Sequence, residues 1–283
     1  MKDDYELLDA GNGRKFEKFG QVTLVRPCSQ ALWQPRLSEM DWRRATASFD
    51  RLDGNNWHGR TNLPKEWKIT TAGITFKLSG TDFGHIGIFS EQRARWCQIR
   101  ETVAEAVKRR PVSVLNLFAY SGGSTFASAL GGAEVCHLDA SRGMVDWARE
   151  NAVLNGLKDH PIRWIVDDAH KFMKRELRRG RHYDAVILDP PTFGRGAGGE
   201  LYKLERDLKE TLSLAKDLLS DRPVFFLFSS HTPGLSPVVS DILIRQLLPE
   251  AKVESGEMLL EGSTTVCPSG VYSFARFPAS SVV

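Results

Sequence analysis

From about Glu91 onward, short apolar runs alternate with stretches of helical periodicity, and this alternation constrains the fold more than any other feature. Helical patterns occur, for example, at 142–154 and 201–219. Apolar runs of strand length recur at 112–118, 134–139, 162–167, 183–189 and 224–228. This order predicts a doubly wound, mostly parallel α/β sheet with helices on both faces.

Both ends of the chain depart from this alternation. Segments 254–260 and 270–277 are predicted to be two strands joined by a turn, which completes a seven-stranded Rossmann-like sheet with an antiparallel ending. Residues 1–90 are rich in turn residues and contain four tryptophans, which we interpret as the core of a small β-rich domain. We therefore expect an N-terminal domain over 1–90 and an α/β domain over 91–283.

The composition is that of a globular protein. Of 283 residues, 41% are hydrophobic and 26% are charged, so a full core can form without a structural metal. A net charge of +3 is compatible with a polyanionic partner but does not require one. The four cysteines are scattered without a CxxC pair, which predicts a reducing cytoplasm and no metal site.

Neither a signal peptide nor a membrane span is expected. The first residues are acidic, and no apolar run approaches the roughly 20 residues of a membrane helix. The oligomeric state is left open.

The turn after the first predicted strand, 119–123, ends in Gly122-Gly123. Glycines allow the backbone to approach a ligand closely, and the start of the following helix offers free N–H groups to a carboxylate. The methionine tail of S-adenosylmethionine needs both features. A tight turn without a ligand explains the two glycines equally well.

Acidic residues follow the second and third predicted strands. Asp139 stands where a carboxylate can accept both ribose hydroxyls, and Asp167-Asp168 stands where one can accept from an adenine amino group. Asp139 and Asp168 could also serve as N-caps of the next helices. A nicotinamide cofactor is disfavoured, because no G-x-G-x-x-G pattern follows the first strand. The pattern favours S-adenosylmethionine.

The fourth predicted strand ends in Asp189-Pro190-Pro191, followed by Phe193. Two prolines remove two backbone donors, so the Asp189 carboxylate and the Pro190 carbonyl remain as acceptors for an amine. Phe193 could stack on a planar base or form a hydrophobic wall. The stretch 194–199 is either a loop that orders over substrate or a plain connector. Asp189, Pro190 and Phe193 are the candidate catalytic residues.

With these residues in place, the chain resembles the bacterial class I RNA methyltransferases that make 5-methylcytosine in 23S ribosomal RNA, and more closely their relatives without an N-terminal PUA domain. The resemblance covers about 81–277, and its motifs lie at 84–93, 114–123, 167–168, 183–193, 228–230 and 268–272. It implies that Gln92 and Arg93 border the methionine end of the cofactor. The candidate cofactor-binding residues are therefore Gln92, Arg93, Asn116, Phe118, Tyr120, Gly122, Asp139, Ala140, Asp167, Asp168 and Asp189.

One departure from that family bears on the acceptor. Methylation of carbon 5 of cytosine needs a thiolate, yet Ser230 stands where the family has a cysteine after the fifth strand, and Thr192 follows the Pro-Pro pair. His231 could act as a base toward Ser230 or be a surface residue. Cys267 could reach the site from the expected C-terminal hairpin, but we interpret it as a buried structural thiol. The hypothesis is transfer to nitrogen or oxygen.

RNA is the expected substrate, with a small molecule, a protein side chain or a cofactor-binding module without catalysis as alternatives. The basic run 178–181 could contact phosphates or be a solvated helix end.

Overall fold

The computed structural model describes residues 3–51, 54–196, 199 and 201–278. It divides into two compact units, which are residues 1–94 with 258–269 and residues 95–257 with 270–283. The first unit therefore takes a segment from the C-terminal end of the chain in addition to its N-terminal part.

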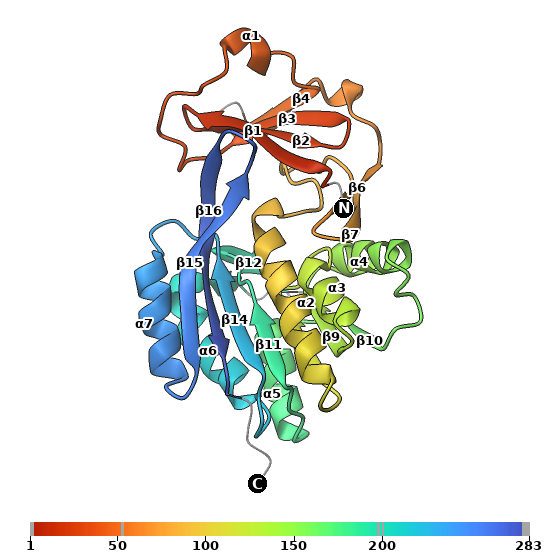
Figure 1. Ribbon diagram of the computed structural model, residues 1–283, viewed down its shortest axis with the longest axis vertical. Helices are drawn as coiled ribbons and strands as arrows, with labels where there is room; N and C mark the ends of the chain where they lie inside the picture. The colour runs from red at the N-terminus through yellow and green to blue at the C-terminus, as the bar shows by residue number, and fades with distance from the viewer. Residues whose placement is uncertain (1–2, 52–53, 197–198, 200, 279–283) are drawn as a thin grey trace. The chain divides into compact units, whose positions relative to one another are not determined.

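The second unit is built on a sheet of seven strands in the order β10-β9-β8-β11-β14-β16-β15 (Figure 1). The pairings from β10 through β14 are parallel, and β16 runs antiparallel to β14. Its strands are β8 (Ser113–Leu117), β9 (Glu134–Asp139), β10 (Ile162–Val166), β11 (Ala185–Leu188), β14 (Phe225–Ser230), β15 (Lys252–Glu261) and β16 (Val266–Arg276). The expected doubly wound α/β fold is confirmed.

In the part of the chain that the structure describes, helices cover both faces of this sheet, with α2 to α4 packed on one face and α5 to α7 on the other (Figure 1). They are α2 (Arg93–Val107), α3 (Gly123–Leu130), α4 (Arg142–Leu154), α5 (Ala169–Arg178), α6 (Leu204–Asp217) and α7 (Pro237–Leu247). Because helices lie on both faces, the central strands β11 and β14 are buried along their whole length. A short hairpin of β12 (Phe193–Arg195) and β13 (Leu201–Lys203) precedes α6.

The first unit contains a five-stranded sheet in the order β1-β2-β3-β4-β5 and a separate two-stranded sheet. The larger sheet consists of β1 (Tyr5–Gly11), β2 (Arg14–Phe19), β3 (Val22–Pro27), β4 (Ala47–Asp50) and β5 (Asn56–His58). The remaining elements are α1 (Glu39–Trp42), η1 (Arg60–Asn62), β6 (Trp67–Thr71), β7 (Ile74–Leu78) and η2 (Ser90–Gln92). The unit is thus rich in short strands.

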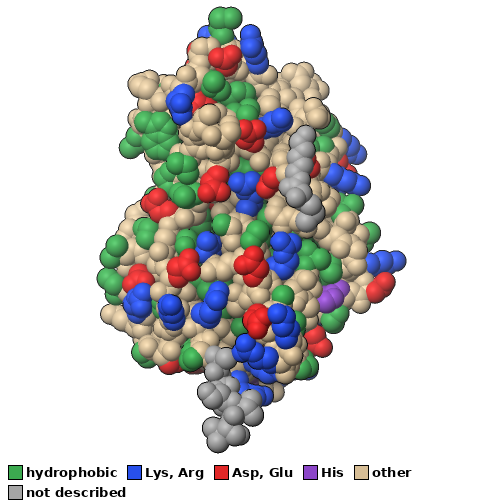
Figure 2. All heavy atoms as spheres, in the orientation of Figure 1, with side chains coloured by type: hydrophobic (Ala, Val, Ile, Leu, Met, Phe, Trp, Pro, Cys, Tyr) green, Lys and Arg blue, Asp and Glu red, His purple; other side chains and the backbone are tan. Residues whose placement is uncertain are grey.

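No helix within the described residues is long and apolar enough to cross a membrane. On the face drawn in Figure 2, basic and acidic side chains are interspersed, so no broad area of this face carries one sign of charge. On this face, recognition of a charged ligand would depend on local groups.

Candidate active site at the carboxyl edge of the second unit's sheet

The strand order of the second unit reverses between β8 and β11, which lie next to each other. In open α/β sheets, ligands bind outside the carboxyl ends of the strands at such a switch point. Leu117 pairs with both Leu138 and Leu188, so the residues that follow β8, β9 and β11 lie at neighbouring positions along this edge. The edge therefore brings together Phe118, Asp139 and Asp189.

The loop after β8 has an unusual backbone. Phe118, Tyr120 and Gly122 all adopt positive φ angles, of 55°, 49° and 101°. Such conformations are costly for residues with a side chain, and they cluster at ligand sites because the surrounding structure must enforce them. A Cβ on Gly122 would lie 2.4 Å from the Phe126 ring, so this position also excludes larger residues.

Asp139, at the end of β9, fixes this loop. Its Oδ2 accepts a hydrogen bond from Tyr120 N at 2.9 Å, and its Oδ1 accepts one from Ser141 N at 2.8 Å. Burial raises the pKa of the Asp139 carboxyl, and the two backbone donors offset this only in part. Each oxygen keeps a second lone pair, which suits a carboxylate that accepts the two hydroxyls of a ribose.

The two acids after β10 are more heavily engaged. Asp167 Oδ2 lies 2.7 Å from Arg175 Nη2, while Oδ1 accepts from Asp168 N. Asp168 is the N-cap of α5, and its Oδ1 accepts from Lys171 N at 2.9 Å. The capping role considered for Asp168 is therefore present, whereas Ser141 rather than Asp139 caps α4. The adenine role of both acids stays a prediction.

Asn116 and Ala140 differ in their surroundings. Asn116 is buried within β8, and its Nδ2 donates to Thr125 Oγ1 at 2.9 Å, which in turn lies 2.8 Å from His137 Nδ1. Asn116 thus ties β8 to α3 beneath the loop. Ala140 is partly buried between Asp139 and the cap of α4. The cofactor-binding role of Asn116 and Ala140 stays a prediction.

The acceptor side is formed by the ends of β11 and β14. Asp189 Oδ1 lies 3.5 Å from His231 Nδ1, and the Thr192 and Thr232 hydroxyls are 2.9 Å apart. These contacts connect the turn after β11 to the turn after β14. Ser230 is buried, and its Oγ accepts from Thr232 N at 3.2 Å. An acidic group therefore stands beside an imidazole at the point where the sheet order reverses.

Pro190 and Phe193 lead from Asp189 into the short hairpin. Pro190 is buried and Phe193 is 53% exposed at the start of β12. An exposed aromatic ring here suits stacking on a base, and this role stays a prediction. Residues 197, 198 and 200 of the expected substrate loop lie outside the described residues.

Gln92 and Arg93 belong to the first unit, and their place at the cofactor stays a prediction. Gln92 is buried at the end of η2. Arg93 Nη1 lies 3.0 Å from Asp3 Oδ2, and its guanidinium lies 4.6 Å from the centre of the Tyr5 ring.

Tyr202 is a residue that sequence reasoning missed. Its ring lies 5.5 Å from the Phe118 ring, centre to centre, and burial raises its pKa to about 12. It therefore supports the strained loop from the hairpin before α6. The sequence predicted a helix over 201–219, whereas Tyr202 lies in β13. No sequence pattern therefore pointed to Tyr202 as a site residue.

Within the described ranges, no group of three or more His, Cys, Asp or Glu side chains could hold a metal ion. The edge thus offers acceptors for hydroxyl and amino hydrogens, a strained loop and an acid beside an imidazole.

Comparison with known proteins identifies a family and several similar proteins. A family model described as S-adenosylmethionine-dependent methyltransferase matches residues 48–237. The ribosomal RNA large subunit methyltransferase K/L of Shewanella pealeana is 35% identical over 174 residues, which are 60% of this chain and 23% of that protein. The protein of the same name from Shewanella loihica is 34% identical over 173 residues, with the same shares. The chain spans about a quarter of the length of these curated relatives.

Solved structures agree. The SAM-dependent methyltransferase from Agrobacterium tumefaciens is 36% identical, with a TM-score of 0.90 over 97% of this chain and 91% of that chain. A chain from Streptococcus mutans shares the fold at 17% identity, with a TM-score of 0.74 over 96% of this chain and 75% of that chain.

Proposed function

Since the chain belongs to the S-adenosylmethionine-dependent methyltransferase family, we propose that it methylates a nitrogen or oxygen atom of an RNA nucleotide. The cofactor and the enzyme class follow from the family. RNA as substrate is supported by the relatives whose names give ribosomal RNA as theirs. Because the chain matches only part of those relatives, RNA remains a proposal.

The carboxyl edge of the second unit suits the cofactor chemically. When bound, S-adenosylmethionine supplies an electrophilic methyl group on a positively charged sulfur. Asp139 has both oxygens anchored by backbone N–H groups and a spare lone pair on each, so it can accept the ribose hydroxyls without moving. The loop at Phe118 and Tyr120 brings main chain to the same edge. Asp167 and Asp168 follow the next strand and are proposed for the adenine.

The observation that carries the choice of acceptor atom is the set of groups after β11 and β14. Asp189 and the Pro190 carbonyl can accept hydrogen bonds from an amino group, which directs its lone pair toward the methyl donor. Methylation of an amine also releases a proton, and the Asp189 carboxylate stands ready to take it. His231, 3.5 Å from Asp189, positions that carboxylate.

Carbon methylation of a pyrimidine lacks its nucleophile here. Thr192 and Ser230 occupy the two strand ends where a thiol would be needed. Among the described residues of the second unit, Cys97 lies on α2 and Cys136 lies in the amino-terminal half of β9. Burial raises the pKa of the Cys136 thiol to about 11, which suppresses its thiolate form. Nitrogen or oxygen is the acceptor that this edge favours.

The test is transfer of label from tritiated S-adenosylmethionine to ribosomal RNA isolated from cells that lack this enzyme. We expect the RNA to be labelled. Digestion to nucleosides should then show that the labelled methyl group is on a nitrogen or an oxygen atom. Label in 5-methylcytidine would overturn the choice of acceptor atom. Binding of S-adenosylhomocysteine without label in any RNA would overturn the RNA substrate and favour a small-molecule or protein acceptor.

A further inference from the structure

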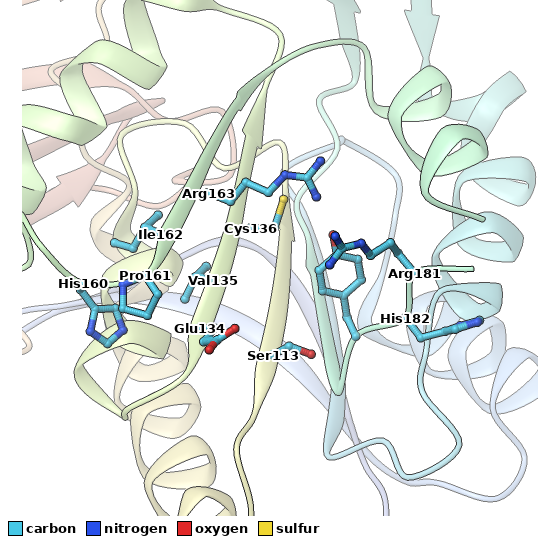
Figure 3. Close-up of a pocket in the computed structure, with 11 residues that line it drawn as sticks. Ser113, Glu134, Val135, Cys136, His160, Pro161, Ile162, Arg163, Arg181 and His182 are labelled. Carbon is cyan, nitrogen blue, oxygen red and sulfur yellow. The ribbon is translucent and has the colours of Figure 1, made fainter. Parts of the chain in front are cut away.

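A cavity opens at the opposite, amino edge of the same sheet (Figure 3). Its volume is about 530 Å³, within the range of pockets that hold small molecules. The first residues of β8 and β9, the start of β10 and the segment before β11 line it. All of these elements belong to the second unit.

This pocket is separate from the site at the carboxyl edge. Glu134, the first residue of β9, lines the pocket, whereas Asp139 is the last residue of the same strand. A rise of about 3.3 Å per residue places the two ends of β9 roughly 16 Å apart. A ligand in the pocket would therefore not occupy the proposed position of the ribose.

Positive charge exceeds negative charge around Arg163, which lines one wall of the pocket. Glu176 is fully buried; its carboxylate accepts from Arg163 Nη1 at 2.8 Å and Nη2 at 3.3 Å, and it lies 3.4 Å from Arg179 Nη1. It also accepts from the Tyr183 hydroxyl at 2.7 Å. One carboxylate thus faces two guanidinium groups, and the Arg163 side chain, which lines the pocket, remains 41% exposed.

Arg181 adds a cation from the opposite wall. The chain leaves α5 through Gly180, which has a left-handed backbone conformation with φ of 63°. Its backbone N donates a hydrogen bond to Leu177 O. Arg181 follows, and within the described ranges its side chain makes no hydrogen bond or ion pair. Figure 3 shows the Arg163 and Arg181 side chains pointing toward one another across the pocket. Two guanidinium groups in this arrangement suit a phosphate.

The remaining wall offers complementary acceptors. Glu134 is exposed, and its carboxylate has no hydrogen bond or ion pair among the residues that the structure describes. His160 Nε2 donates to Ala133 O at 2.7 Å, so Nδ1 is its second polar atom. A carboxylate and an imidazole can pair with the hydroxyl or amino groups of a nucleoside. The pocket is therefore matched to a molecule that is anionic at one end and rich in donors at the other.

We propose that this pocket binds a phosphate-bearing nucleotide, supplied either as a free nucleoside monophosphate or as one nucleotide of an RNA strand. The phosphate lies between Arg163 and Arg181, and the nucleoside lies toward Glu134 and His160. The RNA source rests on the proposed function, whereas the free-nucleotide source does not. The basic run at 178–181 thereby acquires a specific role through Arg181.

The experiment compares the whole protein with Arg181→Gln, and uses Lys209→Gln as a control that removes one exposed charge outside the pocket. Binding of the four nucleoside monophosphates is measured by calorimetry, and binding of a labelled RNA dodecamer is measured by fluorescence anisotropy over a range of salt. We expect Arg181→Gln to weaken the affinity for at least one of these ligands by about tenfold. In the RNA titration, the slope of log affinity against log salt concentration should fall in magnitude by about 1. Lys209→Gln should change neither affinity by more than about twofold.

If Arg181→Gln weakens binding of the dodecamer alone, the source of the nucleotide is RNA. If it weakens binding of a monophosphate, the ligand is a free nucleotide. Equal binding by Arg181→Gln and Lys209→Gln, or no binding of any probe, overturns the proposal. Affinity for S-adenosylhomocysteine should stay the same in both variants, which also shows that they fold. If Arg181→Gln methylates RNA as well as wild type does, the proposed function stands and the pocket has no part in RNA methylation.

Discussion

Each unit of the chain contains a buried carboxylate, and the two carboxylates have different hydrogen-bond donors. Glu17 of the first unit is fully buried; its Oε2 accepts from two nitrogens of Arg26, and its Oε1 accepts from the Tyr5 hydroxyl. Asp139 of the second unit has only backbone N–H groups as donors, and no ion pair within the described residues. The first arrangement is complete by itself, and the second leaves acceptor capacity at the edge of a sheet.

The difference separates structure from function. A buried carboxylate whose oxygens are filled by side chains stabilises its own unit and has little left for a ligand. A carboxylate anchored by main chain alone keeps its position and its free lone pairs, which is what binding of a ligand hydroxyl requires. Mutation of Glu17 should therefore change the stability of the protein, whereas mutation of Asp139 should change its affinity for the cofactor.

The largest effect should come from breaking the complete network. Glu17→Ala leaves the buried Arg26 without its hydrogen-bonded ion-pair partner, so the free energy of unfolding should fall by about 3–5 kcal/mol in urea titrations. Glu39→Ala, which removes a carboxylate paired with Arg14 at the surface, is the control and should have little effect. Equal stability of the two variants would show that Glu17 is not needed as a partner for Arg26.

Asp189→Ala should act on turnover rather than on stability. We expect kcat to fall by about 10²–10³-fold, because the acceptor loses its positioning group, while affinity for S-adenosylhomocysteine changes little. Asp221→Ala, which removes an exposed acid of the same unit, is the matched control. Unaltered turnover of Asp189→Ala in single-turnover assays would remove Asp189 from the mechanism.

Gly122→Ala should have a smaller, mixed effect. A side chain at φ 101° is strained, and its Cβ would clash with Phe126, so unfolding should become easier by about 1–3 kcal/mol and cofactor affinity should drop. Gly156→Ala provides the control, because φ there is also positive but nothing lies within 4 Å of the added Cβ. If both variants bind S-adenosylhomocysteine equally well, the loop shape at Gly122 does not serve the cofactor.

The smallest effect is a dependence on pH. Because burial raises the pKa of Asp139 above the ordinary value of 3.8, the carboxylate protonates earlier as the pH falls. The ionised form accepts hydroxyl hydrogens, so cofactor affinity should be full above this pKa and decline on acidification toward it. Calorimetry at several pH values should show this decline in wild type and not in Asp139→Asn. An identical profile in both proteins would assign the dependence to another group.

The sequence alone predicted the features that depend on local pattern. Buried parallel strands are continuous apolar runs, so β8 to β11 and β14 and the acids that follow them could be located from periodicity. Contacts between side chains of different elements could not be read in this way. Examples are the ion pair that engages Asp167 with Arg175, the hydrogen bond from Asn116 to Thr125, and the packing of Tyr202 on Phe118.

The same limit applies to the units and to the pocket. Residues 258–269 join the first unit through contacts with segments more than 150 residues away, such as Ser269 with Glu91. The pocket at the amino edge depends on four segments that meet only in the folded sheet. Periodicity locates elements, whereas the tertiary structure decides which polar groups remain available.

The central claim is that the main-chain-anchored carboxylate of the second unit holds the cofactor. Calorimetric titration of S-adenosylhomocysteine into wild type and Asp139→Asn, both checked for equal stability, tests it most directly. The account predicts one-site binding to wild type and a loss of affinity of about 10–100-fold in the variant, because two hydrogen bonds to a charged acceptor are weakened. Equal affinity for both proteins, or no binding to wild type, would contradict it.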